Sequence, residues 1–134
     1  MFSTGNTTTS QMSQKELEMR FLTRTRQELE QMRACVPDTQ LPIEPLEMSH
    51  LEQLAAKISS TAEAFGFAEI TVIAGAIELL SQSGATRTTV RERLALATRL
   101  TAQLGALEVH LEYEILQREA FRFQDDADDV SLTA

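Results

Sequence analysis

Residues 54–80 read LAAKISSTAEAFGFAEITVIAGAIELL, and two helical patterns meet in this stretch around Gly66. Before the glycine, apolar residues recur every three or four positions, which is the spacing of one helix face: Leu51, Leu54, Ala55, Ile58, Ala62 and Phe65. After it, a second face is formed by Ile70, Ile73, Ala74, Ile77 and Leu80. Gly66 suits a helix C-cap, because glycine adopts the left-handed backbone there without a Cβ clash. The stretch therefore predicts two amphipathic helices joined by a short turn.

Capping signals place further helices on both sides of this pair. Ser13 and Glu16 have capping-box spacing, in which the hydroxyl and the carboxylate satisfy backbone amides left free at a helix start. The same spacing recurs in Ser49 with Glu52 and in Thr89 with Glu92. The predicted helices span residues 13–36, 50–65, 68–83 and 89–119.

Four amphipathic helices with short links predict an all-α fold, an antiparallel up-down four-helix bundle. The first face is formed by Leu17, Phe21, Leu22, Leu29 and Met32. The fourth is formed by Val90, Leu94, Ala97, Leu100 or Thr101, Leu104, Leu107, Leu111 and Ile115. We expect the following side chains to be almost completely buried: Ile58, Phe65, Ile77, Leu94 and Leu104.

The chain divides into three parts. Residues 1–12 are polar without periodicity and predict a disordered lead, residues 13–120 form the bundle, and residues 121–134 form an acidic tail that we expect to be disordered. The tail holds four aspartates, Asp125, Asp126, Asp128 and Asp129. Three prolines, Pro37, Pro42 and Pro45, predict a stiff connection between the first two helices.

Composition excludes several classes of protein. The chain of 134 residues carries 12 basic and 20 acidic residues, for a net charge of −8. Binding to nucleic acid or to an anionic membrane surface needs clustered Lys and Arg, so neither partner is expected. The single cysteine, Cys35, excludes an internal disulfide. The lead has no apolar run of a signal peptide and no stretch reaches the ~18 apolar residues of a membrane span, so we expect a cytoplasmic protein.

Catalytic and metal-binding motifs are absent from the sequence. The two histidines, His50 and His110, have no second histidine or carboxylate at a spacing typical of a metal site on the same face. Surface roles are the simpler interpretation of both. The sequence therefore predicts no enzyme activity, no metal and no cofactor.

The stretch quoted above, with the Phe65–Gly66–Phe67 turn, resembles the histidine phosphotransfer (HPt) domains of bacterial phosphorelays. The motif of that family is roughly H-x-L-K-G-x-A-x-x-x-G, and here Gly66, Ala62 and Ile58 match its last glycine, alanine and leucine. The first helix is also of the family's type, and the similarity covers about 100 residues, with its specific part between Ala62 and Glu69. The resemblance implies an HPt-like bundle in a two-component signal transduction system.

The chain departs from this family where the chemistry takes place. The phosphoacceptor histidine would stand at position 56, which is Ala56, and the lysine and glycine that follow are replaced by Ser59 and Ser60. A methyl group offers no nucleophile for phosphate transfer. His50 lies six residues earlier, about 120° around the helix and about 9 Å along it, so it would not face the same partner.

The resemblance implies a non-catalytic HPt-like protein that docks to a response-regulator receiver domain or to a histidine kinase. The docking face would comprise Gln53, Ala56, Lys57, Ser60, Ala64 and, from the third helix, Thr71. Ala56 is expected to be exposed, and Lys57 would be a rim charge suited to the acidic site of a receiver. Two alternatives stay open: a helical-bundle interaction or scaffold protein unrelated to phosphorelays, and active phosphotransfer through another residue. The sequence leaves the oligomeric state open.

Overall fold

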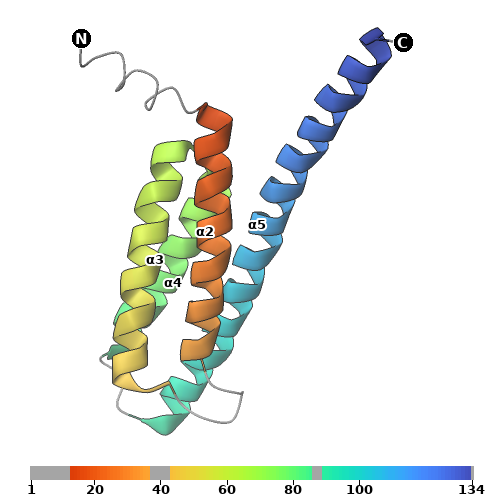
Figure 1. The fold of residues 1–134 in the computed structure, drawn as a ribbon. Helices are drawn as coiled ribbons and strands as arrows, with labels where there is room; N and C mark the ends of the chain where they lie inside the picture. The colour runs from red at the N-terminus through yellow and green to blue at the C-terminus, as the bar shows by residue number, and fades with distance from the viewer. Residues whose placement is uncertain (1–12, 37–42, 86–88, 134) are drawn as a thin grey trace, which may run out of the picture.

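The computed structural model describes residues 13–36, 43–85 and 89–133, and in these parts the chain is helical with no strand. The four helices are α2 (Gln14–Cys35), α3 (Pro45–Phe65), α4 (Ala68–Ala85) and α5 (Val90–Thr133), shown in Figure 1. The predicted all-α class is confirmed. The disordered lead predicted for residues 1–12 lies outside the described residues.

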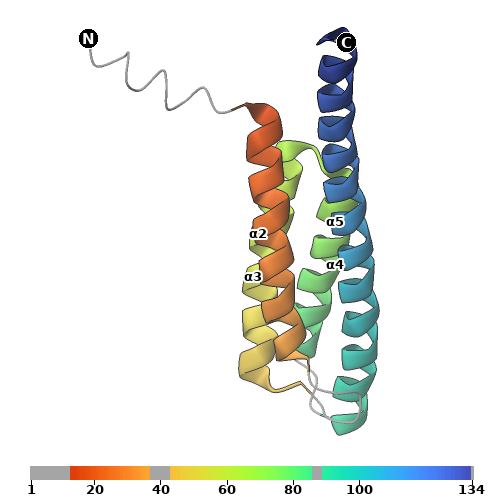
Figure 2. The same cartoon turned by 45° about the vertical axis from the view of Figure 1, so that its right-hand side comes forward.

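The helices pack in a closed ring. α2 contacts α3, α3 contacts α4, α4 contacts α5, and α5 returns to α2, with the closest packing between α3 and α4. Figures 1 and 2 show the bundle from two sides. The core lies inside the ring and its largest completely buried side chains come from every helix: Leu22, Leu29, Met32, Met48, Leu51, Ile58, Ile70, Ile77, Leu100, Leu107 and Leu111, with Ile43 just before α3. In this ring, α3 and α5 are diagonal to each other.

Two of the three predicted capping boxes are confirmed at their first bond. The amide of Glu16 donates to Ser13 Oγ at 3.1 Å, and the amide of Glu92 donates to Thr89 Oγ1 at 3.2 Å. At the start of α5, the Thr89 hydroxyl also donates to the Glu92 carboxylate at 2.8 Å. These local signals correctly place the starts of α2 and α5.

The third capping box, Ser49 with Glu52, is wrong. α3 begins at Pro45, with Glu44 as an extended N-cap residue, so Ser49 lies inside the helix. Proline suits the first helical position because the backbone amide that it lacks would have no hydrogen-bond partner within the helix at that position. The early start carries Met48, which is 2% exposed, into the core.

The predicted end of the fourth helix at residue 119 is also wrong. α5 has 44 residues and its backbone stays helical to Thr133, through the segment expected to be a disordered acidic tail. No glycine or proline follows Gly105, so the sequence contains no helix-breaking residue there. The last turns of α5 extend past the start of α2 in both views (Figures 1 and 2).

The turn between α3 and α4 has the predicted glycine cap. Gly66 has φ +82° and its amide donates back to the carbonyls of Ala62 and Glu63. The amide of Phe67 donates to the Ala62 carbonyl at 2.9 Å, so two amides after the helix satisfy its last carbonyls. This cap brings α4 back against α3 within two residues.

A second glycine is required by packing rather than by its backbone. α4 continues beyond the predicted end at 83, and Gly84 lies buried against Met48 of α3. A Cβ added at Gly84 would lie 2.5 Å from Cε of Met48, which is closer than van der Waals contact allows. The absence of a side chain there lets the two helix ends approach.

The core predictions are confirmed at Ile58, Ile77 and Leu104, which are at most 3% exposed. They are wrong at Phe65 and Leu94, which are only half-buried. Phe65 lies at the end of α3 beside a surface groove, and the ring that the core encloses is that of Phe67, at 7% exposed.

Candidate partner-docking face

The predicted site residues of α3 form one surface of the helix. Gln53, Lys57, Ser60 and Ala64 are exposed, and their spacing of three or four residues places them on one helix face. This arrangement leaves a continuous accessible strip along α3, on the side of the helix away from the core.

Ala56 is half-buried, so the prediction that it is exposed is wrong. It lies on the side of α3 that faces α4, one turn before Ser59, whose hydroxyl donates to the Thr71 carbonyl at 3.3 Å. A Cβ added at Gly75 of α4 would lie 3.9 Å from Ser59 Oγ, which is ordinary van der Waals contact, so α4 lies close to this part of α3 without requiring a glycine. The neighbouring helix therefore shields part of the position where the HPt family has its histidine.

Thr71 borders the strip from α4 but does not offer a free hydroxyl. The residue is half-buried, and its Oγ1 donates to the Phe67 carbonyl at 2.8 Å, one turn earlier in the same helix. Thr71 therefore forms part of the edge of the face, but its hydroxyl hydrogen is already used within α4.

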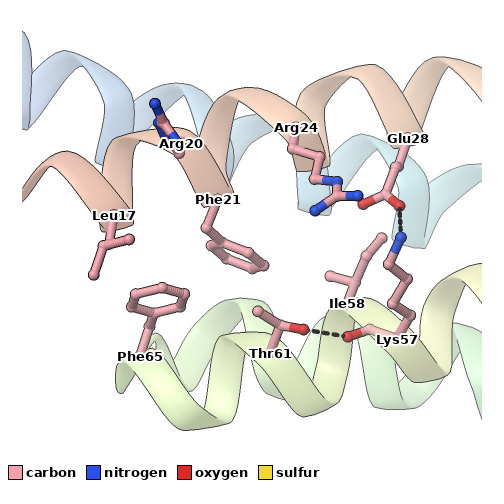
Figure 3. Close-up of a pocket in the computed structure, with 9 residues that line it drawn as sticks. All are labelled: Leu17, Arg20, Phe21, Arg24, Glu28, Lys57, Ile58, Thr61 and Phe65. Atoms are coloured by element: carbon pink, nitrogen blue, oxygen red, sulfur yellow. Dashed lines mark hydrogen bonds and ion pairs between the residues drawn. The ribbon is translucent and has the colours of Figure 1, made fainter. Parts of the chain in front are cut away.

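Lys57 does not present the free charge that the sequence suggested. Its Nζ lies 2.9 Å from Oε2 of Glu28 on α2, and the side chain of Glu28 is only 11% exposed (Figure 3). A buried carboxylate is costly without a partner, so the lysine neutralises it. The ion pair ties α2 to α3 and removes Lys57 from the set of free rim cations.

A groove of about 250 Å³ between α2 and α3 adjoins this face. Lys57 and Thr61 line it from α3, and Figure 3 shows the rings of Phe21 and Phe65 facing each other across its floor. Their ring centroids are 5.3 Å apart, a stacked arrangement that holds the two helices together. The complete lining is Leu17, Arg20, Phe21, Arg24, Glu28, Lys57, Ile58, Thr61 and Phe65.

The groove carries positive charge in an acidic protein. Arg20, Arg24 and Lys57 face a single carboxylate, Glu28. Among the described residues, no carboxylate lies within ion-pair distance of Arg20 or Arg24. Other arginines of α2 are paired with α5: Arg26 with Glu112 at 3.4 Å and Arg33 with Glu108 at 2.7 Å.

Sequence reasoning did not assign Arg20 and Arg24 to the site. Both follow the spacing of Leu17, Phe21 and Glu28 along one side of α2, and that pattern was the available signal. It becomes informative only when α3 is known to pack beside it, because the groove is formed by two helices.

A second, more open hollow of about 560 Å³ borders the other end of the face, near Gln53 and His50. Its lining includes the buried Cys35, whose thiol pKa is raised to about 12 by burial and by the hydrogen bond and negative charge of Glu47. The thiol therefore stays protonated at neutral pH and is not a nucleophile. His50 is exposed and His110 is half-buried.

The described residues contain no group of three or more metal-ligating side chains. No helix in the described ranges combines the length and apolar character needed to cross a bilayer. Comparisons of the chain with protein-family models, with curated proteins and with solved structures find no match.

Proposed function

We propose that the chain is a non-catalytic HPt-like protein that docks to the receiver domain of a response regulator, or to a histidine kinase, in a two-component phosphorelay. The proposal includes an antiparallel up-down topology and a cytoplasmic location. The packing of each helix against its neighbours in sequence, with α5 closing the ring on α2, supports that topology.

The observation that carries the proposal is the accessible strip of α3 formed by Gln53, Lys57, Ser60 and Ala64, which borders the half-buried Ala56. The strip has no nucleophile at the phosphoacceptor position of the HPt pattern, and its exposed members are short or uncharged apart from the paired Lys57. A flat helix face of this kind admits close approach by a partner domain. It supports docking without phosphate uptake.

Charge supports an acidic partner surface. The cations suited to the acidic site of a receiver are Arg20 and Arg24 in the groove, in place of Lys57, because their guanidinium groups have no carboxylate partner among the described residues. Complementary charge at the rim of an interface accelerates association and selects the partner. A partner seated on α3 would meet these arginines at its α2 edge.

Calorimetric titration of the full chain with purified receiver domains from the source organism tests the proposal. We expect one receiver to bind, and Arg24→Glu to weaken that binding roughly tenfold, because an attractive rim contact becomes repulsive. Arg91→Glu, an exposed arginine at the start of α5, is the matched control and should bind as the wild type does. The docking proposal is overturned if no receiver or kinase domain binds, and the assigned face is wrong if both variants weaken binding equally.

A second candidate function is supported by exposed apolar side chains outside this face. Val72 and Leu79 on α4 are 69% and 67% exposed, and α5 carries a further group. Apolar patches of this kind mark interaction surfaces. They favour a bundle that serves as an interaction or scaffold protein, and binding that depends on Leu79 but not on Arg24 would identify it.

A further inference from the structure

α5 carries an apolar stripe on the face opposite to the core. Val109, Tyr113 and Leu116 are 66%, 55% and 60% exposed, and Ala120, one turn further, is also exposed. The buried residues of the same helix, such as Leu107 and Leu111, lie on the other side. A helix that buries one face in its own bundle therefore presents a second apolar face outward.

The spacing of this outer stripe is that of a coiled coil. Its members recur at steps of four, three and four residues, and the sequence continues the same alternation along helical backbone: Val109, Tyr113, Leu116, Ala120, Phe123, Ala127 and Val130. A strict seven-residue repeat of this kind is the seam of a two-stranded coiled coil, with these residues at the a and d positions. None of the four tail aspartates falls at an a or d position.

The end of α5 extends beyond the ring of helices (Figures 1 and 2). Arg118 of α5 pairs with Glu18 of α2 at 2.8 Å and lies over the Phe67 ring. Beyond this point the helix runs to Thr133, past the start of α2 (Figures 1 and 2). A single helical segment is marginal in water, so packing on another helix would stabilise an extension of this kind.

We infer that the outer face of α5 forms a parallel two-stranded coiled coil with a second copy of this chain. A second copy fits because a stripe on a two-fold axis is self-complementary: each a and d residue meets its own equivalent. The charges select the parallel orientation. Glu112, Glu119 and Asp126 occupy the g positions, whereas Gln117 and Gln124 occupy the e positions.

In a parallel pair, g residues face e residues of the partner five positions later, so Glu112 faces Gln117 and Glu119 faces Gln124, without repulsion. An antiparallel pair places acidic g residues opposite one another, and the like charges of two Glu119 residues there oppose assembly. Glu112 adds less to this repulsion, because it pairs with Arg26 of its own chain. The dimer also leaves the docking face open, because α3 is diagonal to α5 in the ring. The inference does not depend on the proposed function.

Light scattering coupled to size-exclusion chromatography of the full chain measures the mass directly. We expect twice the 14.9 kDa of one chain. Leu116→Glu and Tyr113→Glu should each shift the protein to the monomer while the bundle stays folded, shown by a cooperative urea unfolding transition, since both side chains are largely exposed. Leu79→Glu, at an equally exposed apolar position on α4, should remain dimeric. A monomeric wild type, or a dimer that survives both α5 variants, overturns the inference.

Disulfide trapping tests the orientation. In a parallel pair, Val109→Cys places two thiols side by side at the start of the seam, and mild oxidation should link the chains. An antiparallel pair places residue 109 near residue 130 of the other copy, so no link forms. Wild type carries only the buried Cys35 and serves as the control. A dimer that does not link at position 109 contradicts the parallel arrangement.

Discussion

The ammonium nitrogen of Lys57 on α3 lies 2.9 Å from Oε2 of Glu28 on α2, and Glu28 is the one charged residue that the bundle buries among the described residues. The ion pair joins two helices, and its two residues are 29 positions apart in the sequence. A lysine that looks like a docking charge in the sequence therefore has a structural partner. Charge reversal at Lys57 would change folding and docking together, which is why Arg24 is the cleaner probe of the interface.

Removing the lysine alone should destabilise the fold. We expect Lys57→Met to lower the free energy of unfolding by about 1–2 kcal/mol, because it leaves the Glu28 carboxylate unpaired while the exposed half of Lys57 limits the loss. The double variant Glu28→Met, Lys57→Met should be more stable than Lys57→Met, since no buried charge remains. Urea denaturation measures both. A double variant less stable than the single one would show that the carboxylate is well solvated.

The two phenylalanines of the turn should differ in their contribution to stability. Phe67 is 7% exposed and stacks on Phe21 at 5.7 Å, so Phe67→Ala should cost about 3–5 kcal/mol through lost burial and a cavity. Phe65 is half-buried at the groove, and Phe65→Ala should cost clearly less. Chemical denaturation of the two variants side by side decides the order. A larger loss of stability in Phe65→Ala than in Phe67→Ala would show that Phe65 is the core residue of the two.

Two glycines should respond to alanine with opposite signs. Gly84→Ala should destabilise by about 1–3 kcal/mol, because the new methyl group overlaps the buried Met48 side chain. Gly105→Ala, in the middle of α5 with no atom within 4 Å of the added Cβ, should stabilise by about 0.5–1 kcal/mol through helix propensity. Thermal unfolding of both variants checks the signs, and a neutral Gly84→Ala would mean that Met48 moves aside freely.

The buried thiol makes stability depend on alkaline pH. The pKa of Cys35 is raised from 9.0 to about 12 in the fold, so between these values the folded chain keeps a proton that the unfolded chain releases. The contribution of the Cys35 thiol to the free energy of unfolding is fully present below about pH 9, and it is lost as the pH rises toward 12. Urea denaturation across this range should show a steeper loss in wild type than in Cys35→Ala. Equal slopes in both proteins would contradict the shifted pKa.

Local signals in the sequence predicted much of the fold. Ser13 and Thr89 mark helix starts, and Gly66 marks a helix end, because each acts through bonds to residues within four positions. The apolar faces of α3 and α4 were also readable, since period alone places Ile58 and Ile77 in the core.

Features that depend on two helices could not be read in this way. Phe67 is buried more deeply than Phe65, and this difference depends on where Phe21 of α2 lies. The role of Lys57 likewise depends on its ion pair with Glu28. The length of α5 is a further case: the run of aspartates predicts an irregular tail by its composition, whereas the segment contains no helix breaker and its backbone is helical to Thr133.

Transfer of labelled phosphate from a phosphorylated receiver domain is the most direct test of docking without phosphate uptake. Wild type should acquire no acid-labile phosphate, and Ala56→His combined with Ser60→Gly should acquire it, because the imidazole then occupies the phosphoacceptor position of the proposed docking face. Ala64→His, an exposed position two turns away on the same helix, is the control and should stay unlabelled. Acid-labile phosphate on the wild-type chain, or labelling of the Ala64 variant in place of the Ala56 variant, would contradict the proposed HPt-like function.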